Sequence, residues 1–548
     1  MNSKHDRANT TDIDWVLSLF DLDSVEGRAF DQQLSKLANQ FLQSEHFTSP
    51  GSSALVRDKL LDTRMPEDPL SPGAYLDYIE ADIVSEAMNV ASPRFVGRMT
   101  SALPSFVRHV GHLMLAMNQN TVKLETSKSL TYLERQVLAI IHRFVYRFEP
   151  SFYAEHVQNS ASTLGMITSG GTVANITALW CARNQALGPQ RDFAGVEAEG
   201  IPAALAHYGY AGAVVIGSSL MHYSLEKAVG VLGLGTRSLR RVPVNHQNQV
   251  DLKALKDVLA ECKRRKQLVV AIIGVAGTTD SGAIDPLAEM ADLANEYGTH
   301  FHIDAAWGGA MLFSREHGPK LAGIEGADSV TFDGHKQLYL PIGIGMVLFR
   351  DPRMAANIEK QARYIVRPGS FDLGRRSLEG SRPAMVLLLH AALNLIGRRG
   401  YEALIDEGIR KAQYLVQTIA GRPEFEVLVQ PQMNIVLYRY LPRRYRSNSM
   451  LHDLSEDDQV VINEFNQRLQ QRQRRAGLTF VSRTTLECTC PGHTVPVVAL
   501  RAVFANPLTT QRDIEAVLDD QVRLAESLES ENQSMAVRLP PRAARVSF

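Results

Sequence analysis

Cysteine and net charge are both scarce in this 548-residue sequence. Its four cysteines exclude a small scaffold held together by disulfides. The 58 Lys and Arg residues balance 59 Asp and Glu residues, so charge favours neither a nucleic acid nor an anionic membrane surface as a partner. No apolar run approaches the roughly 18 residues of a membrane span, and the N-terminus lacks the apolar core of a signal peptide. We therefore expect a soluble, cytoplasmic protein with no nucleic-acid or membrane partner.

Two local patterns suggest other functions but carry little weight. Cys488 and Cys490 form a C-x-C pair with His493 nearby. A zinc site of this kind needs further ligands, and no second pair follows, so we expect loop cysteines and no metal. An arginine-rich stretch, INEFNQRLQQRQRRAG, suggests RNA binding, but its amphipathic spacing favours the solvated face of a helix.

The chain is too long for one ordinary domain, and its 45% hydrophobic content supports a large core. Apolar residues at three- and four-residue spacing predict helices up to residue 148. Short apolar strands then alternate with helices until about residue 350. The pattern predicts four parts: a helical segment (1–148), a large α/β domain (149–383), a small C-terminal α+β domain (384–530) and a polar tail (531–548).

Seven short apolar runs are the expected strands of the large domain. They are LGMIT, AVVIG, RSLRRVPV, QLVVAIIGV, HFHID, DSVTFD and GMVLF. Strands that alternate with helices are typical of a mostly parallel sheet with helices on both faces. The carboxyl ends of such strands form a crevice where ligands bind. Polar residues at those ends are therefore the candidate site residues.

Two of these strands end on an acid and a lysine. Asp304 closes FHID, and Lys336 follows DSVTFD, directly after His335. Pyridoxal phosphate (PLP) chemistry needs this pair, because a lysine amine holds the cofactor aldehyde as a Schiff base and a carboxylate keeps the pyridine nitrogen protonated. The small residues after Asp304, including Ala306, leave room for a flat ring. Taken alone, such a pair is more often a capping aspartate and a surface lysine.

Other strand ends add weaker signals at the same crevice. Gly171 and Thr172 lie where a strand turns into a helix, which leaves backbone N–H groups open to an anion. His222 begins a later helix, and Thr279 belongs to the polar loop AGTTDSG. Separately these residues also fit a glycine turn, a structural histidine and an ordinary loop.

In chain order, GGT, His222, GTT, HIDAAWGG and DGHK resemble the fold-type I PLP enzymes. More narrowly, the set resembles the group II amino acid decarboxylases over roughly residues 75 to 510. The similarity is greatest to the glutamate-decarboxylase-like branch, which includes the bacterial aspartate 1-decarboxylases that make β-alanine, a pantothenate precursor. The resemblance implies a homodimer whose N-terminal helices wrap the partner and whose active sites are shared.

The resemblance also implies a role for each candidate residue. Lys336 binds the cofactor, Asp304 pairs with the pyridine nitrogen, and His222 and Ala306 lie on the two ring faces. Gly171 and Thr172 hold the phosphate, Thr279 contacts the cofactor, and His335 lies close to cofactor and substrate. Arg501, in LRAVFANP, binds the substrate α-carboxylate, because a guanidinium matches a carboxylate in two places.

The sequence offers two candidate donors for the final Cα proton. Many relatives carry a tyrosine in a mobile loop for this step, and an alignment of SFDL with their YDL places Phe371 there. A phenyl ring cannot donate a proton. Tyr364, the nearest hydroxyl in this loop, and His335 are the alternative donors.

An acidic amino acid is the expected substrate, because arginines are abundant around the expected crevice. Aspartate is preferred, with glutamate and cysteine sulfinate as alternatives, whereas no acidic cluster suits a second amine. An aminotransferase, a cysteine desulfurase and a non-enzymatic binding module are the competing interpretations of the fold. The arginines are Arg98, Arg363, Arg367, Arg375, Arg376 and Arg382.

Overall fold

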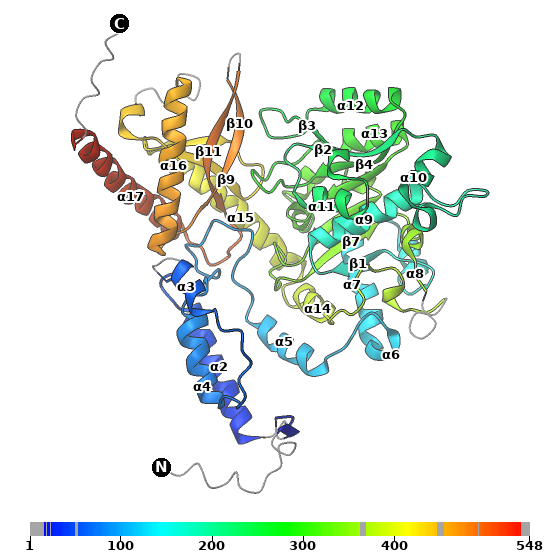
Figure 1. Cartoon of the computed structure of the whole chain (residues 1–548), viewed down its shortest axis with the longest axis horizontal. Helices are drawn as coiled ribbons and strands as arrows, with labels where there is room; N and C mark the ends of the chain where they lie inside the picture. The colour runs from blue at the N-terminus through cyan, green and yellow to red at the C-terminus, as the bar shows by residue number, and fades with distance from the viewer. Residues whose placement is uncertain are drawn as a thin grey trace.

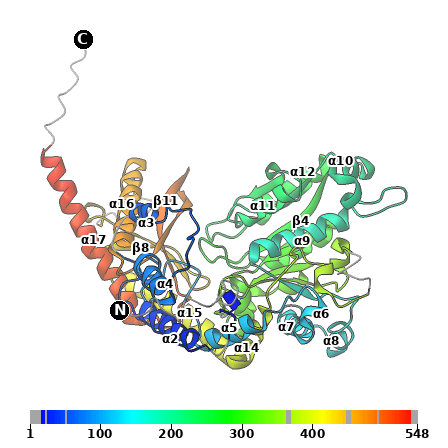
Figure 2. The same cartoon turned by 60° about the horizontal axis from the view of Figure 1, so that its bottom comes forward.

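The chain forms a large α/β body, a smaller body with its own sheet, and N-terminal helices beside the smaller body (Figure 1, Figure 2). The computed structural model describes residues 16–17, 19–21, 24–49, 53–361, 369–446, 454–490 and 493–538. Phe47 and Phe95 of the N-terminal segment pack against Phe480 of the smaller body, which joins the two. The N-terminal helices are α2 (Val25–Leu42), α3 (Ser53–Lys59), α4 (Pro72–Tyr78) and the π-helix η2 (Ile79–Val84).

All seven expected strands form one sheet in the large body, as predicted. The strand order is β1-β7-β6-β5-β4-β2-β3, and only β7 runs antiparallel to its neighbours. Both faces are covered by helices, which explains why the strands read as nearly continuous apolar runs. The strands are β1 (Gly165–Thr168), β2 (Gly212–Ser218), β3 (Leu239–Val242), β4 (Gln267–Val275), β5 (His300–Asp304), β6 (Ser329–Asp333) and β7 (Gly345–Phe349).

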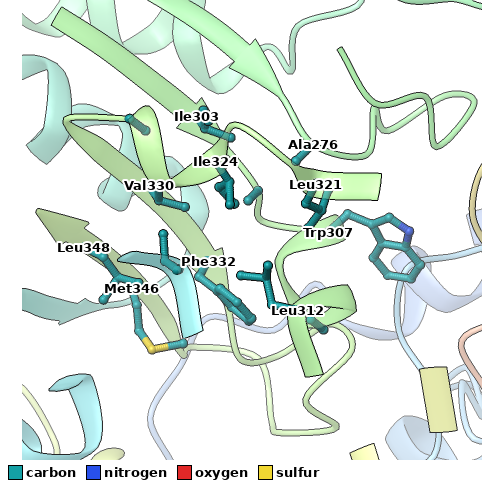
Figure 3. Close-up of a cluster of buried hydrophobic side chains, with 14 of the residues drawn as sticks. Ala276, Ile303, Trp307, Leu312, Leu321, Ile324, Val330, Phe332, Met346 and Leu348 are labelled. Atoms are coloured by element: carbon teal, nitrogen blue, oxygen red, sulfur yellow. The ribbon is translucent and has the colours of Figure 1, made fainter. Parts of the chain in front are cut away.

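Alternate residues of the strands enter two different cores. Ile303, Val330 and Phe332 face one layer, shown in Figure 3. Val215, Ile273 and their neighbours face the other layer, against α9 and α11. This two-sided burial is the period-2 alternation of strand side chains. The covering helices are α7 (Ser129–Tyr146), α12 (Leu252–Arg264) and α13 (Leu287–Tyr297) on the first face, and α9 (Gly171–Ala186) and α11 (Ser224–Val231) on the second.

The helical segment before residue 149 is not one unit. Val137, Ile141 and Val145 of α7 are fully buried in the core of the large body. This helix therefore packs on its own sheet, and the expectation that the whole of residues 1–148 wraps a partner does not fit α7. The remaining helices of this region are α5 (Phe106–Met117), α6 (Leu124–Ser127) and α8 (Pro150–His156), and α10 (Val196–Tyr208) follows later.

The smaller body follows a break that the sequence pattern did not predict. The apolar periodicity of MVLLLHAALNLIGRRGYEALIDEGIRKAQYLVQTIA predicts one long helix, but α14 (Val386–Leu395) ends before α15 (Gly397–Ala420). Gly397 has φ +67°, a left-handed conformation that glycine adopts freely. The last helix, α17, continues to Arg538, past residue 531, where we expected the tail to begin.

A four-stranded antiparallel sheet in the order β10-β11-β9-β8 forms the centre of the smaller body, which agrees with the expected α+β fold. Its elements are β8 (Phe425–Val429), β9 (Ile435–Tyr440), α16 (Glu456–Ala476), β10 (Ser482–Cys490), β11 (His493–Val503) and α17 (Gln511–Arg538). The 3₁₀ turns are η3 (Thr236–Ser238), η4 (Gly308–Phe313), η5 (Gly318–Leu321), η6 (Ile324–Gly326), η7 (Met354–Ile358), η8 (Leu373–Arg375) and η9 (Arg443–Tyr445). None of the described helices combines the length and the apolar character that a membrane crossing requires.

A buried ion pair ties α7 to the segment before α14. Both terminal nitrogens of Arg382 donate to Glu134, at 2.8 and 2.7 Å, and the two side chains are 4% and 1% exposed. We expect Arg382→Met to lower the free energy of unfolding by about 3 kcal/mol or more, because Glu134 keeps an uncompensated buried charge. Chemical denaturation of the purified protein measures this change.

The exposed pair between Arg353 and Asp351 provides the control for this experiment. Arg353→Met should leave stability almost unchanged, since exposed ion pairs contribute little. Adding Glu134→Leu to Arg382→Met should recover most of the loss. Equal stabilities of Arg382→Met and Arg353→Met would show that the buried pair does not hold the two segments together.

Candidate active site

The carboxyl ends of β5 and β6 lie side by side at one edge of the sheet. The two strands are parallel and pair from His302 with Ser329 to Asp304 with Thr331. Beside them is a cavity of about 370 Å³. Eight of the ten predicted site residues line it: Gly171, Thr172, His222, Thr279, Asp304, Ala306, His335 and Lys336.

Lys336 meets a carboxylate that the sequence analysis did not select. Its Nζ lies 3.3 Å from Oδ2 of Asp333, the last residue of β6, which is 3% exposed. His335 donates from Nδ1 to the carbonyl of Ile344 at 3.0 Å and places Nε2 3.7 Å from the same Oδ2. Oδ1 of Asp333 has no hydrogen-bond partner among the described residues. An aspartate at the end of a buried strand, three residues before the lysine, was the signal in the sequence.

Asp304 is held on two sides and opens toward the cavity. Its Oδ1 accepts from the Ala306 backbone N–H at 3.1 Å, and its Oδ2 accepts from Nδ2 of Asn175 at 2.9 Å. The side chain is 7% exposed. Each carboxylate oxygen has a second lone pair, so Asp304 can accept a further proton donor from a ligand in the cavity.

The amino end of α9 forms another wall of the cavity. Gly170 precedes the helix with φ +150°, and no side chain caps the helix. A Cβ on Gly171 would lie 2.9 Å from Oδ2 of Asp333, so a glycine is needed for this close approach. The first N–H groups of a helix lack partners within the helix, and together with the Thr172 hydroxyl they suit a phosphate.

The donor set therefore fits PLP. A lysine amine, a carboxylate for a ring nitrogen, a helix terminus for a phosphate and small residues around Ala306 surround one cavity. Within the described ranges, no group of three or more His, Cys, Asp or Glu side chains is arranged to hold a metal ion.

Comparison with known proteins agrees with this geometry. The family model named pyridoxal-dependent decarboxylase conserved domain matches residues 55–441, well over half of the chain. The chain belongs to this family. The pyridoxal-dependent decarboxylase has PLP as its cofactor and is an amino acid decarboxylase. The interpretations as an aminotransferase, a desulfurase or a non-enzymatic module are therefore set aside.

The relatives of this pyridoxal-dependent decarboxylase act on different amino acids, according to their names. Aspartate 1-decarboxylase of Aliivibrio fischeri is 42% identical over 504 residues, which is 91% of each chain. L-2,4-Diaminobutyrate decarboxylase of Rhizobium meliloti is 31% identical and matches 69% of this chain and 71% of the relative. The crystal structure of mouse CSAD has a TM-score of 0.80 at 23% identity, covering 92% of this chain and 99% of that one. This structure supports the expected fold.

Arg501 does not line the cavity of the decarboxylase but lies behind it. Its Nε donates to the carbonyl of Asp280 at 3.1 Å, next to Thr279, and its Nη1 donates to Ser482 Oγ at 3.1 Å. Its Nη2 is buried and has no partner among the described residues. Burial lowers the pKa of Arg501 to about 10, and the nearby charge of Arg98 adds to this effect.

The loop expected to supply a proton donor is only partly described. Tyr364 lies outside the described residues, as do Arg363 and Arg367. Phe371 packs edge-on against Tyr132, with ring centroids 5.2 Å apart, and lies under Arg135. Phe371 lines a separate cavity and not the cavity around Lys336.

Most of the described arginines from the expected crevice are engaged elsewhere. Arg375 and Arg376 both pair with Glu359, and Arg382 pairs with Glu134. Arg98 is exposed and forms no ion pair with any described residue. Abundance of arginine in the sequence is therefore poor support for an acidic substrate, because three of the four described side chains already form ion pairs, with two carboxylates between them.

Sequence reasoning also missed a buried polar cluster below the cavity: Asn175, Ser224 and His302, which are 1%, 0% and 0% exposed. His302 Nε2 lies 3.0 Å from Asn175 Oδ1. Burial lowers the pKa of His302 to about 3, and burial likewise lowers the pKa of His222 from its ordinary value. Both imidazoles are therefore neutral at neutral pH. The available signal was a polar residue, Asn175, in the apolar first half of the helix that follows GGT.

Proposed function

We propose that this decarboxylase converts L-aspartate to β-alanine and CO₂. The observation that carries the proposal is the 42% identity to the protein named aspartate 1-decarboxylase, which extends over 91% of both chains. Relatives with other named substrates match at 31% identity or less. The product would serve as a pantothenate precursor.

L-2,4-Diaminobutyrate is the second candidate substrate, because two relatives carry that name. Its second ammonium group needs an acidic partner in the pocket. The acids among the described lining residues are Asp304 and Asp333. Asp304 is assigned to the pyridine nitrogen, and Asp333 faces Lys336 and His335. A second ammonium therefore lacks a dedicated carboxylate there, which favours aspartate.

Each residue around the cavity has a proposed task. Lys336 holds the cofactor through its amine, and Asp304 keeps the pyridine nitrogen protonated. Gly171 and Thr172 bind the phosphate, Thr279 contacts the cofactor, and His222 and Ala306 confine the ring from its two faces. Bound PLP supplies an electron-accepting ring for the pair released when the Cα–carboxylate bond breaks.

Orientation of the substrate is assigned to Arg501. Its Nη2 is buried outside the cavity without a described partner, and in this proposal it turns toward the α-carboxylate when substrate binds and holds the bond that breaks perpendicular to the ring. Protonation of Cα is assigned to Tyr364 or His335, whose Nε2 faces Asp333 at the cavity wall. Phe371 has no proton to donate, and its contact with Tyr132 leaves it outside this cavity.

A homodimer with shared active sites completes the proposal. The helices α4 and α5 expose large apolar side chains: Tyr75, Tyr78, Leu113 and Leu115. Burial of such side chains against a second copy would be favourable. We retain the division at residues 148, 383 and 530 as a proposal, with α7 packed on the large body.

The test is to incubate the purified PLP-loaded protein separately with aspartate, glutamate, cysteine sulfinate and 2,4-diaminobutyrate, and to identify each product by mass. We expect β-alanine from aspartate as the fastest reaction. Faster formation of γ-aminobutyrate, hypotaurine or 1,3-diaminopropane would replace aspartate by the corresponding substrate. An aldehyde in place of the amine would contradict the assignment of the proton donors, and a keto acid would contradict decarboxylation itself.

Arg501→Lys should reduce kcat/KM for the preferred substrate by about 10²-fold, because an ammonium cannot match the fork of the guanidinium. Steady-state kinetics at saturating PLP measure the change. Arg483→Lys, on the same hairpin but exposed, is the control and should have little effect. Equal kinetics of the two variants would remove Arg501 from the substrate site.

A further inference from the structure

A continuous set of hydrogen bonds joins Asp304 to His222 beneath the cavity. Asn175 Nδ2 lies 2.9 Å from Asp304 Oδ2 and 2.9 Å from Ser224 Oγ. Ser224 Oγ lies 2.9 Å from Nδ1 of His222. Asn175, Ser224 and Asp304 come from α9, α11 and β5 and are buried, whereas His222 precedes α11 and is half-buried at the cavity.

The carboxylate fixes the direction of the bonds on its side of the network. A carboxylate only accepts hydrogen bonds, so Asn175 must present its NH₂ group to Asp304. Its carbonyl oxygen then faces Nε2 of His302, which must carry a hydrogen. Nδ1 of the neutral His302 in turn accepts from the Ser329 hydroxyl at 2.8 Å.

The same reasoning fixes the direction of the hydrogen bonds at the His222 end of the network. The backbone N–H of Ser224 donates to Nδ1 of His222 at 3.3 Å, so this nitrogen carries no hydrogen. Ser224 Oγ accepts from Asn175, and its own hydrogen must point to Nδ1 of His222. A neutral imidazole with a bare Nδ1 has its single hydrogen on Nε2. Nδ1 of His222 is therefore a shared acceptor, for the Ser224 hydroxyl at 2.9 Å and for the Ser224 backbone N–H at 3.3 Å.

We propose that Asn175 and Ser224 are positioning residues that couple Asp304 to His222 and hold His222 as the neutral Nε2–H imidazole. The coupling has a physical benefit. When Asp304 keeps the pyridine nitrogen protonated, the cofactor ring carries positive charge, and a cationic imidazole beside it would be repelled. The inference depends on the cofactor site and not on which amino acid is the substrate.

The charged groups around His222 do not replace this network. Asp304 at the end of β5, Asp333 and Lys336 around the end of β6, and Lys227 of α11 act on its charge. The two acids favour protonation and the two lysines oppose it, whereas the Ser224 hydroxyl is bonded to the ring itself. A hydrogen bond donated to the neutral form favours that form.

The test is ¹⁵N NMR of the histidine-labelled, full-length protein loaded with PLP, followed over a pH titration. Its 16 histidines require a difference spectrum against His222→Gln to identify the His222 signals. In the wild type we expect a bare Nδ1 and a protonated Nε2 at neutral pH. In Ser224→Ala the proton affinity of His222 should rise about 2- to 10-fold, the contribution of one hydrogen bond.

Asn175→Leu should shift the His222 titration in the same direction, although Asn175 does not touch His222. It should also raise the dissociation constant of PLP about 10-fold or more, as loss of a supporting hydrogen bond does at comparable sites. Ser224→Thr keeps the hydroxyl and should titrate like the wild type. Asn184→Ala removes another buried amide of α9, bonded to Asn357, and is the matched control.

Three results would overturn the proposal. The first is a wild-type His222 with its hydrogen on Nδ1 or with both nitrogens protonated at neutral pH. The second is an unchanged His222 titration in Ser224→Ala. The third is an Asn175→Leu protein that loads PLP but titrates like Asn184→Ala. If Asn175→Leu does not fold, the comparison of Ser224→Ala with Ser224→Thr still tests whether the Ser224 hydroxyl keeps His222 neutral.

Discussion

Lys336→Ala is expected to abolish decarboxylation, with a loss on the order of 10⁴-fold or more in kcat. In the proposed assignment its amine fixes the cofactor, and no other described lysine lines the cavity. The variant should also lose the visible absorbance of bound PLP after gel filtration. Both changes are measured on the same purified sample.

Lys360→Ala is the control for this variant. Lys360 pairs with Glu197 at 2.5 Å and does not line the cofactor cavity. The Lys360→Ala protein should keep both its decarboxylase activity and the visible absorbance of bound PLP. A Lys336→Ala protein that decarboxylates at a tenth of the wild-type rate would move the cofactor attachment to another residue.

Asp304→Asn should lower kcat by about 10²- to 10³-fold, the usual effect of removing one electrostatic contact with the reacting group. The amide cannot hold a proton on the pyridine nitrogen, so the ring becomes a poorer electron acceptor. Its NH₂ group would also compete with Asn175 for the same space, since both would then donate. Single-turnover kinetics at saturating PLP separate this effect from weaker cofactor binding.

Asp292→Asn, an exposed aspartate of α13, is the matched change and should have no effect. If Asp304→Asn keeps near-wild-type turnover once PLP is saturating, Asp304 serves binding and not electron acceptance. An intermediate result, with the loss confined to the dissociation constant of PLP, would lead to the same conclusion.

The sequence was informative where a property is local. Each of the seven strands of the large sheet is a short apolar run, and the carboxyl ends of parallel strands meet at one edge of a sheet. The pattern therefore predicted that Asp304 and Lys336 line the same cavity. The sequence also contains Gly397, but a glycine within an apolar periodic stretch does not by itself show whether its φ is positive.

The sequence was uninformative where the outcome depends on partners distant in the chain. Arg382 and Glu134 are 248 residues apart, and Asn175 and Asp304 are 129 residues apart. The composition shows that arginine is abundant, but it does not show which arginines form an ion pair with an acidic residue. The same limit applies to α7, whose apolar stripe fits a partner subunit as well as it fits its own sheet.

One helix, α9, performs several tasks at once. Its first turn lines the cavity, Asn175 reaches Asp304, and Ala174, Ala178 and Cys181 pack in the core against the sheet. Occupancy of the cofactor site is therefore thermodynamically linked to the stability of the whole large body. A ligand that binds only the folded chain raises its melting temperature in proportion to the logarithm of ligand concentration. Cellular PLP supply would thus set how much of this protein survives proteolysis as well as how much is active.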